Sequence, residues 1–243
     1  MLLPVSENGI LATCRLLVES PVNQKTLTER YTIEAQRFIQ QNRDRPFFLY
    51  LPHTMPHAPW AASEEFGGKS KHGTYGDAVE ELDWSTGKIL RALRETEVDR
   101  NTLVIFTSED GAWVGGKRAG GGSNGLFRGG RFTAWEGGCR MPFPARWPGR
   151  ITAGAVRSDI ARTMDLFTTA VALAKGKPPA DRAIDGFNKA SVLDGAGDSP
   201  RTDLYCFTCP LTSKFQLAAV RSSSKADNFG DRLRNLGIPP RRS

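Results

Sequence analysis

Two short apolar runs, each followed by polar residues of catalytic type, constrain this 243-residue chain most strongly. Residues 47–51 (FFLYL) lead into Pro52-His-Thr-Met-Pro-His57, and residues 103–106 (LVIF) lead into Thr107-Ser-Glu-Asp-Gly111. Both runs have the length and flanking breakers typical of strands buried on both faces. Open α/β sheets bind ligands beyond the carboxyl ends of their strands. The two segments therefore predict a binding site at one edge of a sheet.

Helical patterns alternate with these runs and indicate an α/β fold. The predicted helix at residues 26–42 begins with Thr26-Leu-Thr-Glu29, which has the pattern of a capping box. Apolar residues at helical spacing predict further helices at residues 75–96 and at about 160–174, the latter behind a Ser158 cap.

The rest of the chain shows two further patterns. Residues 111–138 hold 11 of the 25 glycines, which predicts a loop that brings backbone close to a neighbour. Residues 204–207 and 217–220 are candidates for short strands.

Composition excludes several classes of protein. The hydrophobic class is 39% and the charged class 24%, which is ordinary for a globular protein with a core. The longest apolar stretches are far shorter than the roughly 18 residues of a membrane span, so no membrane partner is expected. Nor does the start of the chain resemble a secretory signal peptide, since Met1 to Leu17 has no basic region before its apolar residues.

The net charge of +7 favours an anionic partner. Residues 117–150 carry seven basic side chains against one acidic, and residues 214–242 carry seven against two. A basic nucleic-acid-binding protein is one alternative on this charge. The aromatic interleaving and the motifs of that class are absent from the sequence, however, so no nucleic-acid partner is expected.

Glu109 and Asp110 are the candidate metal ligands. Two adjacent carboxylates offer the hard oxygen atoms that Ca²⁺ and Mg²⁺ prefer. The same residues before Gly111 also fit an ordinary turn, in which the acid caps a helix and the glycine takes a positive φ. The dipeptide leaves both interpretations open.

Histidine and arginine supply the other candidates. His53 and His57 follow the first apolar run in a proline-rich loop. A histidine there binds metal, moves a proton or donates to an oxyanion, or it simply bonds to backbone. Arg128 and Arg131 in the glycine-rich loop fit either an anion-binding fork or solvated surface charges.

Four segments, taken in order, carry a family resemblance: residues 45–59, 75–84, 102–111 and 126–142. Together they resemble the sulfatase family of the alkaline-phosphatase-like superfamily, and most of all its arylsulfatase A and N-acetylgalactosamine-6-sulfatase type. The resemblance runs from about residue 18 to about residue 220. It implies a sulfuric ester hydrolase, with a sulfate ester as substrate.

The resemblance also implies the architecture. We expect a partial alkaline-phosphatase-like α/β sheet flanked by helices, with the start of a small C-terminal antiparallel sheet. Residues 1–200 are then an incomplete catalytic domain, residues 201–221 begin the C-terminal subdomain, and residues 222–243 are a disordered basic tail.

By the same resemblance, four residues take family roles. His57 corresponds to the histidine that binds sulfate and serves the leaving group, and Arg131 to a lysine that contacts the sulfate. Glu109 and Asp110 correspond to an Asp-Asn or Asp-His pair of calcium ligands. Three of these positions depart from the family pattern: Glu109 reaches one methylene further, Asp110 adds a negative charge, and Arg131 replaces a point-like ammonium with a planar group.

The family nucleophile is a formylglycine made from Cys or Ser in a C/S-x-P-x-R segment, and the 243 residues contain no such segment. The family's early Asp-Asp metal pair is also absent. We therefore expect a chain that lacks an N-terminal portion, is inactive alone and binds calcium weakly. A phosphoryl ester hydrolase of the same superfamily is the other enzymatic alternative. Family members are usually periplasmic, secreted or lysosomal; the location, the natural substrate and the oligomeric state of this chain stay open.

Overall fold

The structure, a computed structural model, describes residues 19–114, 121–208 and 216–223. By their contacts these residues fall into two compact units, residues up to 38 with 48–89 and residues 39–47 with 90–223. The elements in chain order are η1 (Gln24–Thr26), α1 (Leu27–Asn42), α2 (Gly73–Glu95), η2 (Asp99–Asn101), β1 (Val104–Ile105), α3 (Glu136–Cys139), β2 (Ala145–Arg146), α4 (Met164–Leu173), α5 (Ala190–Leu193), β3 (Asp203–Thr208) and β4 (Gln216–Ser222).

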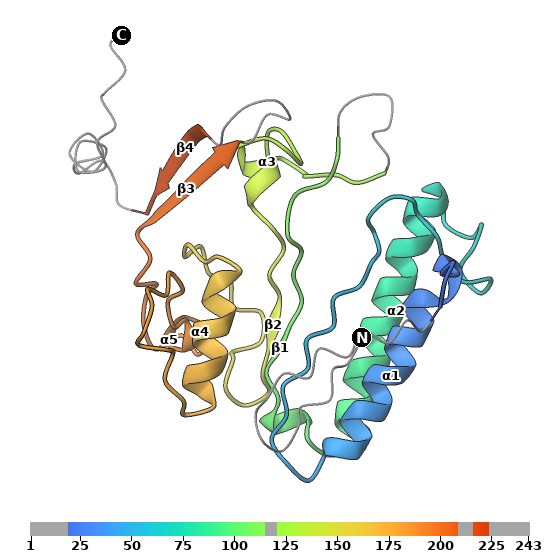
Figure 1. Cartoon of the computed structure of the whole chain (residues 1–243), viewed down its shortest axis with the longest axis horizontal. Coiled ribbons are helices and arrows are strands. Elements are labelled where there is room, and N and C mark those ends of the chain that lie inside the picture. Colours follow the sequence, from blue (N-terminus) through green and yellow to red (C-terminus); the bar gives the residue numbers. More distant parts are fainter. Residues whose placement is uncertain (1–18, 115–120, 209–215, 224–243) are drawn as a thin grey trace. The chain divides into compact units, whose positions relative to one another are not determined.

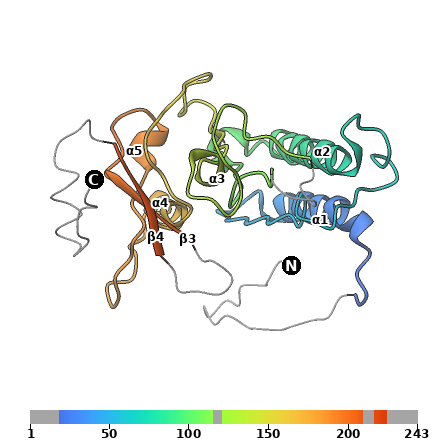
Figure 2. The same cartoon turned by 90° about the horizontal axis from the view of Figure 1, so that it is seen from above.

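The first unit is built on the pairing of α1 with α2, which lie side by side in Figures 1 and 2. Ala35 of α1 and Ala78 of α2 are both almost fully buried. Between the helices, the hydroxyls of Thr32 and Ser85 lie 2.6 Å apart, and the Thr32 hydroxyl also donates to the Thr28 carbonyl at 2.7 Å. These bonds remove the cost of burying the hydroxyl groups. The helices predicted at residues 26–42 and 75–96 are thus confirmed.

The start of α1 differs from the prediction. Asn23 caps the preceding 3₁₀ turn, with its side-chain oxygen accepting from the Lys25 amide at 3.2 Å. Thr26 lies inside that turn, where its hydroxyl donates to the Asn23 carbonyl at 3.1 Å. The predicted capping box is therefore wrong. Asn is as good a capping residue as Thr, and the extra turn moves the start of the helix past Thr26.

Residues 47–51 are extended but form no strand, so the predicted buried strand is wrong for this chain. Phe48 and Tyr50 are each 74% exposed, whereas Phe47, Leu49 and Leu51 are half-buried. An extended segment becomes a buried strand only when neighbouring strands satisfy its backbone and cover both faces. Among the described residues, no strand pairs with this segment.

In the second unit, β1 pairs with β2 in antiparallel register, Val104 opposite Arg146 and Ile105 opposite Ala145. The run predicted as a buried strand is thus a strand of only two residues, and it is half-buried. Asp99, the first residue of η2, which precedes β1, accepts two hydrogen bonds from the Arg146 guanidinium at 2.5 and 2.8 Å. This fork fixes the register of the short pair, which two backbone pairings alone would hold poorly.

The predicted C-terminal strands are confirmed. Strands β3 and β4 form an antiparallel pair with an irregularity between Cys206 and Phe207. The helix predicted at about 160–174 is also present as α4, but it begins after Thr163, so the proposed Ser158 cap is wrong. The partial α/β architecture with a small antiparallel sheet is as expected. No helix within the described ranges is long and apolar enough to cross a membrane. The tail was predicted at residues 222–243; Ser222 is the last residue of β4, and residues 224–243 lie outside the described residues.

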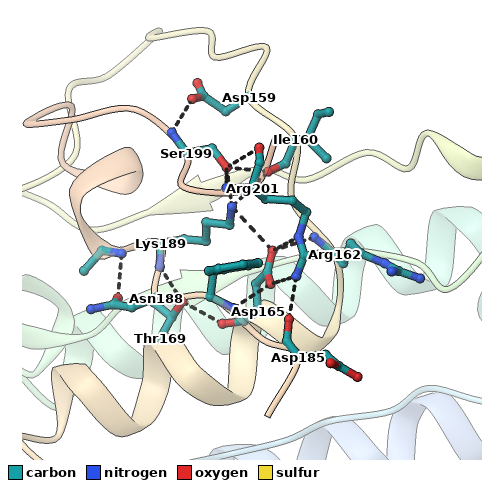
Figure 3. A network of polar contacts seen from close by, with 12 residues as sticks. Asp159, Ile160, Arg162, Asp165, Thr169, Asp185, Asn188, Lys189, Ser199 and Arg201 are labelled. Carbon is teal, nitrogen blue, oxygen red and sulfur yellow. Dashed lines mark hydrogen bonds and ion pairs between the residues drawn. The ribbon is translucent and has the colours of Figure 1, made fainter. Parts of the chain in front are cut away.

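A buried ionic network joins α4 to the loops that follow it (Figure 3). Asp165, 2% exposed, accepts from the Arg201 guanidinium at 2.6 Å and from the backbone amides of Arg162 and Phe187, each at 2.9 Å. Burial by itself raises the pKa of Asp165, but the bonds from Arg201 and the two amides outweigh it, so the pKa is lowered. The charged form is therefore the one built into the fold.

Lys189 extends this network to the chain segment before β3. Its ammonium, on a residue only 6% exposed, donates to the Ile160 carbonyl at 2.9 Å and to the Ser199 hydroxyl, and it lies 3.6 Å from Asp165. The Ser199 amide in turn donates to Asp159 at 2.8 Å. Three distant segments of the chain are thus held by one set of charges.

We expect Asp165→Ala to lower the free energy of unfolding by about 3–5 kcal/mol, because it leaves the buried Arg201 charge without its partner. Urea denaturation of the full chain measures this loss. Asp181→Ala is the matched control, since Asp181 and Arg182 pair at 2.7 Å with both side chains about two-thirds exposed; an exposed pair contributes about 0–1 kcal/mol. Equal losses in the two variants would contradict the structural role of the network.

The carboxylate of Glu81 in α2 is buried, and its hydrogen bonds only partly offset the cost of burying it. Only 1% of it is exposed; one carboxylate oxygen accepts from the Ser63 amide at 3.1 Å, and the other has no hydrogen-bond partner among the described residues. Burial raises the pKa of Glu81, the bonds from Ser63 oppose this, and the nearby charges of Glu29 and Glu65 add to the increase.

A raised pKa makes the first unit less stable as the pH rises. The stability that Glu81 contributes is complete below its unfolded pKa of 4.5 and is lost as the pH rises through the higher folded value. Glu81→Gln should therefore raise the melting temperature at pH 7 and change it little at pH 4. Differential scanning calorimetry at both pH values tests this, with the exposed Glu80→Gln as control; an equal gain at both pH values would count against it.

Candidate functional site

The second unit brings two of the predicted site residues into contact. Arg131 Nε lies 2.9 Å from an oxygen of the Asp110 carboxylate, and the two side chains are 23% and 31% exposed. The contact is an ion pair rather than a well-aligned hydrogen bond, because the Nε hydrogen has no acceptor in bonding geometry. Asp110 follows β1 in the chain, and its role at a binding site stays a prediction. The pair is partly solvated and can be reached by a ligand.

Asn124 holds the two segments that carry this pair. Its side-chain oxygen accepts from the Ala112 amide at 2.9 Å, and its amide nitrogen donates to the Ala112 carbonyl at 3.2 Å and to the Gly129 carbonyl at 3.0 Å. The Arg131 amide donates to the same Ala112 carbonyl at 3.1 Å. One side chain therefore positions both Asp110 and Arg131, and sequence analysis missed it. Its only sequence signal is an asparagine within a glycine-rich stretch, which is typical of many loops.

Four glycines allow these segments to touch; we call Gly111, Gly130, Gly137 and Gly138 the glycine cluster. A Cβ at Gly111 would lie 1.8 Å from the Gly137 carbonyl oxygen, and one at Gly130 would lie 2.4 Å from the Ala112 carbonyl oxygen. At Gly138 a Cβ would lie 2.3 Å from the Thr133 carbonyl oxygen. No side chain fits at these separations, so the glycine-rich composition reflects close backbone contact, as predicted. Within this region the chain also forms the single helical turn α3, which the loop prediction did not include.

Glu109 is exposed and lies beside Ser108, whose hydroxyl donates to it at 3.2 Å. Glu109 and Asp110 offer the carboxylate oxygens that calcium prefers, but Ca²⁺ takes about 6–8 oxygen ligands. Among the described residues, no group of three or more histidine, cysteine, aspartate or glutamate side chains is placed to hold a metal ion. The described residues thus fit calcium only in part, and one of the two carboxylates already pairs with Arg131.

His57 belongs to the other compact unit, so its predicted position near Arg131 stays a prediction. It is exposed, and its Nδ1 lies 2.7 Å from the Ala58 carbonyl oxygen. Because a carbonyl only accepts, Nδ1 carries the hydrogen and, in the neutral ring, Nε2 is the acceptor. Met55, 4% exposed, packs with Ala78 and Leu82 and anchors the loop that presents this histidine.

His53 has a different environment. Its Nε2 lies 3.5 Å from the Ser85 hydroxyl, and its ring contacts Tyr31 at 5.9 Å between centroids. Burial lowers the pKa of His53, which keeps the ring neutral at pH 7. These contacts anchor the loop to the helix pair through the side chains of Ser85 and Tyr31, and not through the backbone bond that was the non-functional alternative. Arg128, the other candidate arginine, lies over the Trp135 ring at 3.9 Å.

Solved structures define the class of fold. The chain matches the PsFucS1 sulfatase from Pseudoalteromonas sp. with a TM-score of 0.74 and 28% identity, over 84% of this chain and 42% of that one. It also matches Ps i-CgsB, solved in complex with a neocarrahexaose, with a TM-score of 0.67 and 30% identity, over 75% of this chain and 42% of that one. These neighbours place the chain in the alkaline-phosphatase-like α/β class that its sequence resembles.

The chain belongs to the sulfatase family, whose model matches residues 7–177. N-acetylgalactosamine-6-sulfatase of Homo sapiens is 50% identical over 184 residues, which are 74% of this chain and 35% of that protein. Steryl-sulfatase of Homo sapiens is 43% identical over 191 residues, 77% of this chain and 32% of that protein. The chain therefore spans about a third of the length of these relatives. The family drawn from the four sequence segments is confirmed.

Alanine at a glycine of the cluster and alanine at a glycine of α2 should change the stability of the chain in opposite directions. Gly111→Ala should destabilise the chain by about 1–3 kcal/mol, because the new methyl group forces the Gly137 carbonyl away. Gly87→Ala, inside α2 with no atom within 4 Å of the added Cβ, should stabilise it by about 0.5–1 kcal/mol through the loss of unfolded-state entropy. Urea denaturation of both variants gives the two signs. A neutral Gly111→Ala would show that the cluster is less closely packed than described.

Proposed function

We propose that this chain carries the anion-binding part of a sulfuric ester hydrolase site, with Arg131 as the group that contacts the sulfate. The observation that carries the proposal is the partly exposed Arg131 guanidinium, held beside Asp110 just beyond β1 by the bonds that Ala112 makes with the Arg131 amide and the Asn124 side chain. A guanidinium binds a tetrahedral oxyanion through charge-assisted hydrogen bonds. Membership of the sulfatase family supports sulfate as that anion.

The remaining family roles form part of the same proposal. His57 would bind the sulfate and serve the leaving group, which suits an exposed ring whose Nδ1 is fixed on a backbone carbonyl. Glu109 and Asp110 would be the calcium ligands that this chain contributes. In the sulfatase family, calcium neutralises the charge of the sulfate oxygens, and formylglycine supplies the nucleophile. The described residues offer calcium too few ligands to hold it by themselves.

We infer that the 243 residues alone do not turn over a sulfate ester, since they contain no C/S-x-P-x-R segment from which the family nucleophile is made. Incubation with nitrocatechol sulfate, and in parallel with a nitrophenyl phosphate, tests this. Clear sulfatase turnover that is abolished by His57→Ala would contradict the inference, and phosphatase turnover would favour the phosphoryl hydrolase alternative.

Sulfate binding can be measured without turnover, and it should respond in opposite directions to two neighbouring substitutions. Arg131→Ala removes the cation and should weaken sulfate binding roughly 10- to 100-fold, as expected for lost charge-assisted bonds. Asp110→Asn removes the carboxylate that competes for Arg131 and repels the anion, so it should strengthen binding in the absence of calcium. Isothermal titration of the full chain with sodium sulfate provides both values.

Arg182→Ala is the matched control for these titrations. Arg182 is an exposed arginine that also pairs with an aspartate, Asp181, but it lies outside the proposed site. This variant should bind sulfate as the unsubstituted chain does. If Arg182→Ala weakens sulfate binding as much as Arg131→Ala, the binding reflects net charge and the proposed site is wrong.

A further inference from the structure

One exposed aromatic side chain contacts Arg131 and a second contacts the first, and the proposed sulfate contact uses neither of them. Phe132, the residue after Arg131, is 73% exposed, and Trp113 is 38% exposed. Their ring centroids lie 6.1 Å apart with the planes at 83°, an edge-to-face arrangement. The Arg131 guanidinium carbon lies 5.0 Å from the centroid of the Phe132 ring. A cation and two apolar rings are thus presented together.

The backbone holds Phe132 in a conformation that its side chain does not favour. Its φ is +69°, in the left-handed region, where a residue other than glycine or asparagine is strained. Strain of this kind persists only where the surroundings impose it, and it concentrates at sites that bind ligands. On either side, the Arg131 amide donates to Ala112 and the Thr133 amide donates to Gly130 at 3.0 Å. The ring is therefore placed by backbone contacts rather than by packing of its own.

The same contacts place the second ring. Ala112, which accepts from the Arg131 amide, immediately precedes Trp113, so a single backbone hydrogen bond joins the two residues that precede the aromatic pair. Asn124 fixes Ala112 from the other side. Ligand sites combine apolar and aromatic walls with a few positioned polar groups, and this arrangement has both.

We propose that Trp113 and Phe132 form a platform that binds the ring of a cyclic sulfate ester while Arg131 holds its sulfate group. The inference rests on the proposed sulfate contact. It adds a binding contact for the alcohol part of the ester. The shared chemistry is a six-membered ring with an apolar face, which both an aryl group and a sugar pyranose possess. Contacts of this kind select among sulfate esters without taking part in the chemistry.

The test compares three sulfate esters on the full chain by isothermal titration: p-nitrophenyl sulfate, galactose 6-sulfate and methyl sulfate, which has no ring. The chain should bind at least one ring ester roughly 2- to 12-fold more tightly than methyl sulfate, the range expected for one aromatic contact. Tighter binding of the nitrophenyl ester alone identifies an aryl ligand, and tighter binding of the sugar ester alone identifies a pyranose. Equal binding of all three esters overturns the platform.

Phe132→Asn is the decisive variant, because asparagine tolerates a positive φ and so removes the ring while keeping the backbone. It should abolish the preference for the ring ester and leave methyl sulfate binding unchanged, as should Trp113→Ala. Phe48→Asn, at a 74%-exposed aromatic residue of the other unit, is the matched control and should keep the preference. An equal loss for methyl sulfate in Phe132→Asn would show that the ring only supports the local structure, and would overturn the inference.

The two proposals fail in different ways. If the unsubstituted chain binds methyl sulfate and loses it in Arg131→Ala, the sulfate contact stands whatever the ring esters do. If no sulfate ester binds, the sulfate contact is wrong and the platform falls with it. An exposed aromatic pair can instead bind a second copy of the chain, and sedimentation velocity of the chain and of Phe132→Asn tests this. If the chain self-associates, Phe132→Asn abolishes the association and no ring ester is preferred, the pair is an interface and the platform is overturned.

Discussion

The contact between the backbone after β1 and the glycine-rich segment is the constraint on which the candidate site depends. The carbonyl oxygen of Ala112 accepts from both Arg131 and Asn124, at a separation that only the glycine cluster permits. Every group assigned to the site in this unit lies within three residues of that contact. Because backbone bonds and the Asn124 side chain together set the spacing, the charged groups need little further ordering to meet an anion.

The pairing of Asp110 with Arg131 gives the departures from the family pattern a common physical meaning. The sulfatase pattern has a neutral Asn at the position of Asp110 and a Lys at the position of Arg131. Here the added negative charge lies 2.9 Å from the arginine. Arg131 keeps the charge of the lysine it replaces, so the carboxylate added at Asp110 pairs with a cation that the family pattern already has. A sulfate would have to open this internal ion pair.

Local patterns in the sequence predicted those elements that are stabilised locally. Helices α1 and α2 and the β3–β4 pair follow from periodicity, since one apolar face or one neighbouring strand suffices for each. Helix caps were predicted poorly: Asn23 and Thr163 stand where Thr26 and Ser158 were expected, because several residues of capping type lie near each helix start. The apolar run at residues 47–51 shows the same limit, since a buried strand requires partners that its own sequence does not encode.

By itself, the amino-acid sequence determined the family of this protein, its partial α/β class and the residue types of its site, because these depend on the order and spacing of segments along the chain. Only the tertiary structure paired Asp110 with Arg131, revealed Asn124 as the residue that positions both, and placed Trp113 against Phe132. These contacts join segments separated by loops, and the geometry of a loop is set by the close approach of backbone in three dimensions. The composition of such a loop indicates that an approach occurs, but not which atoms meet.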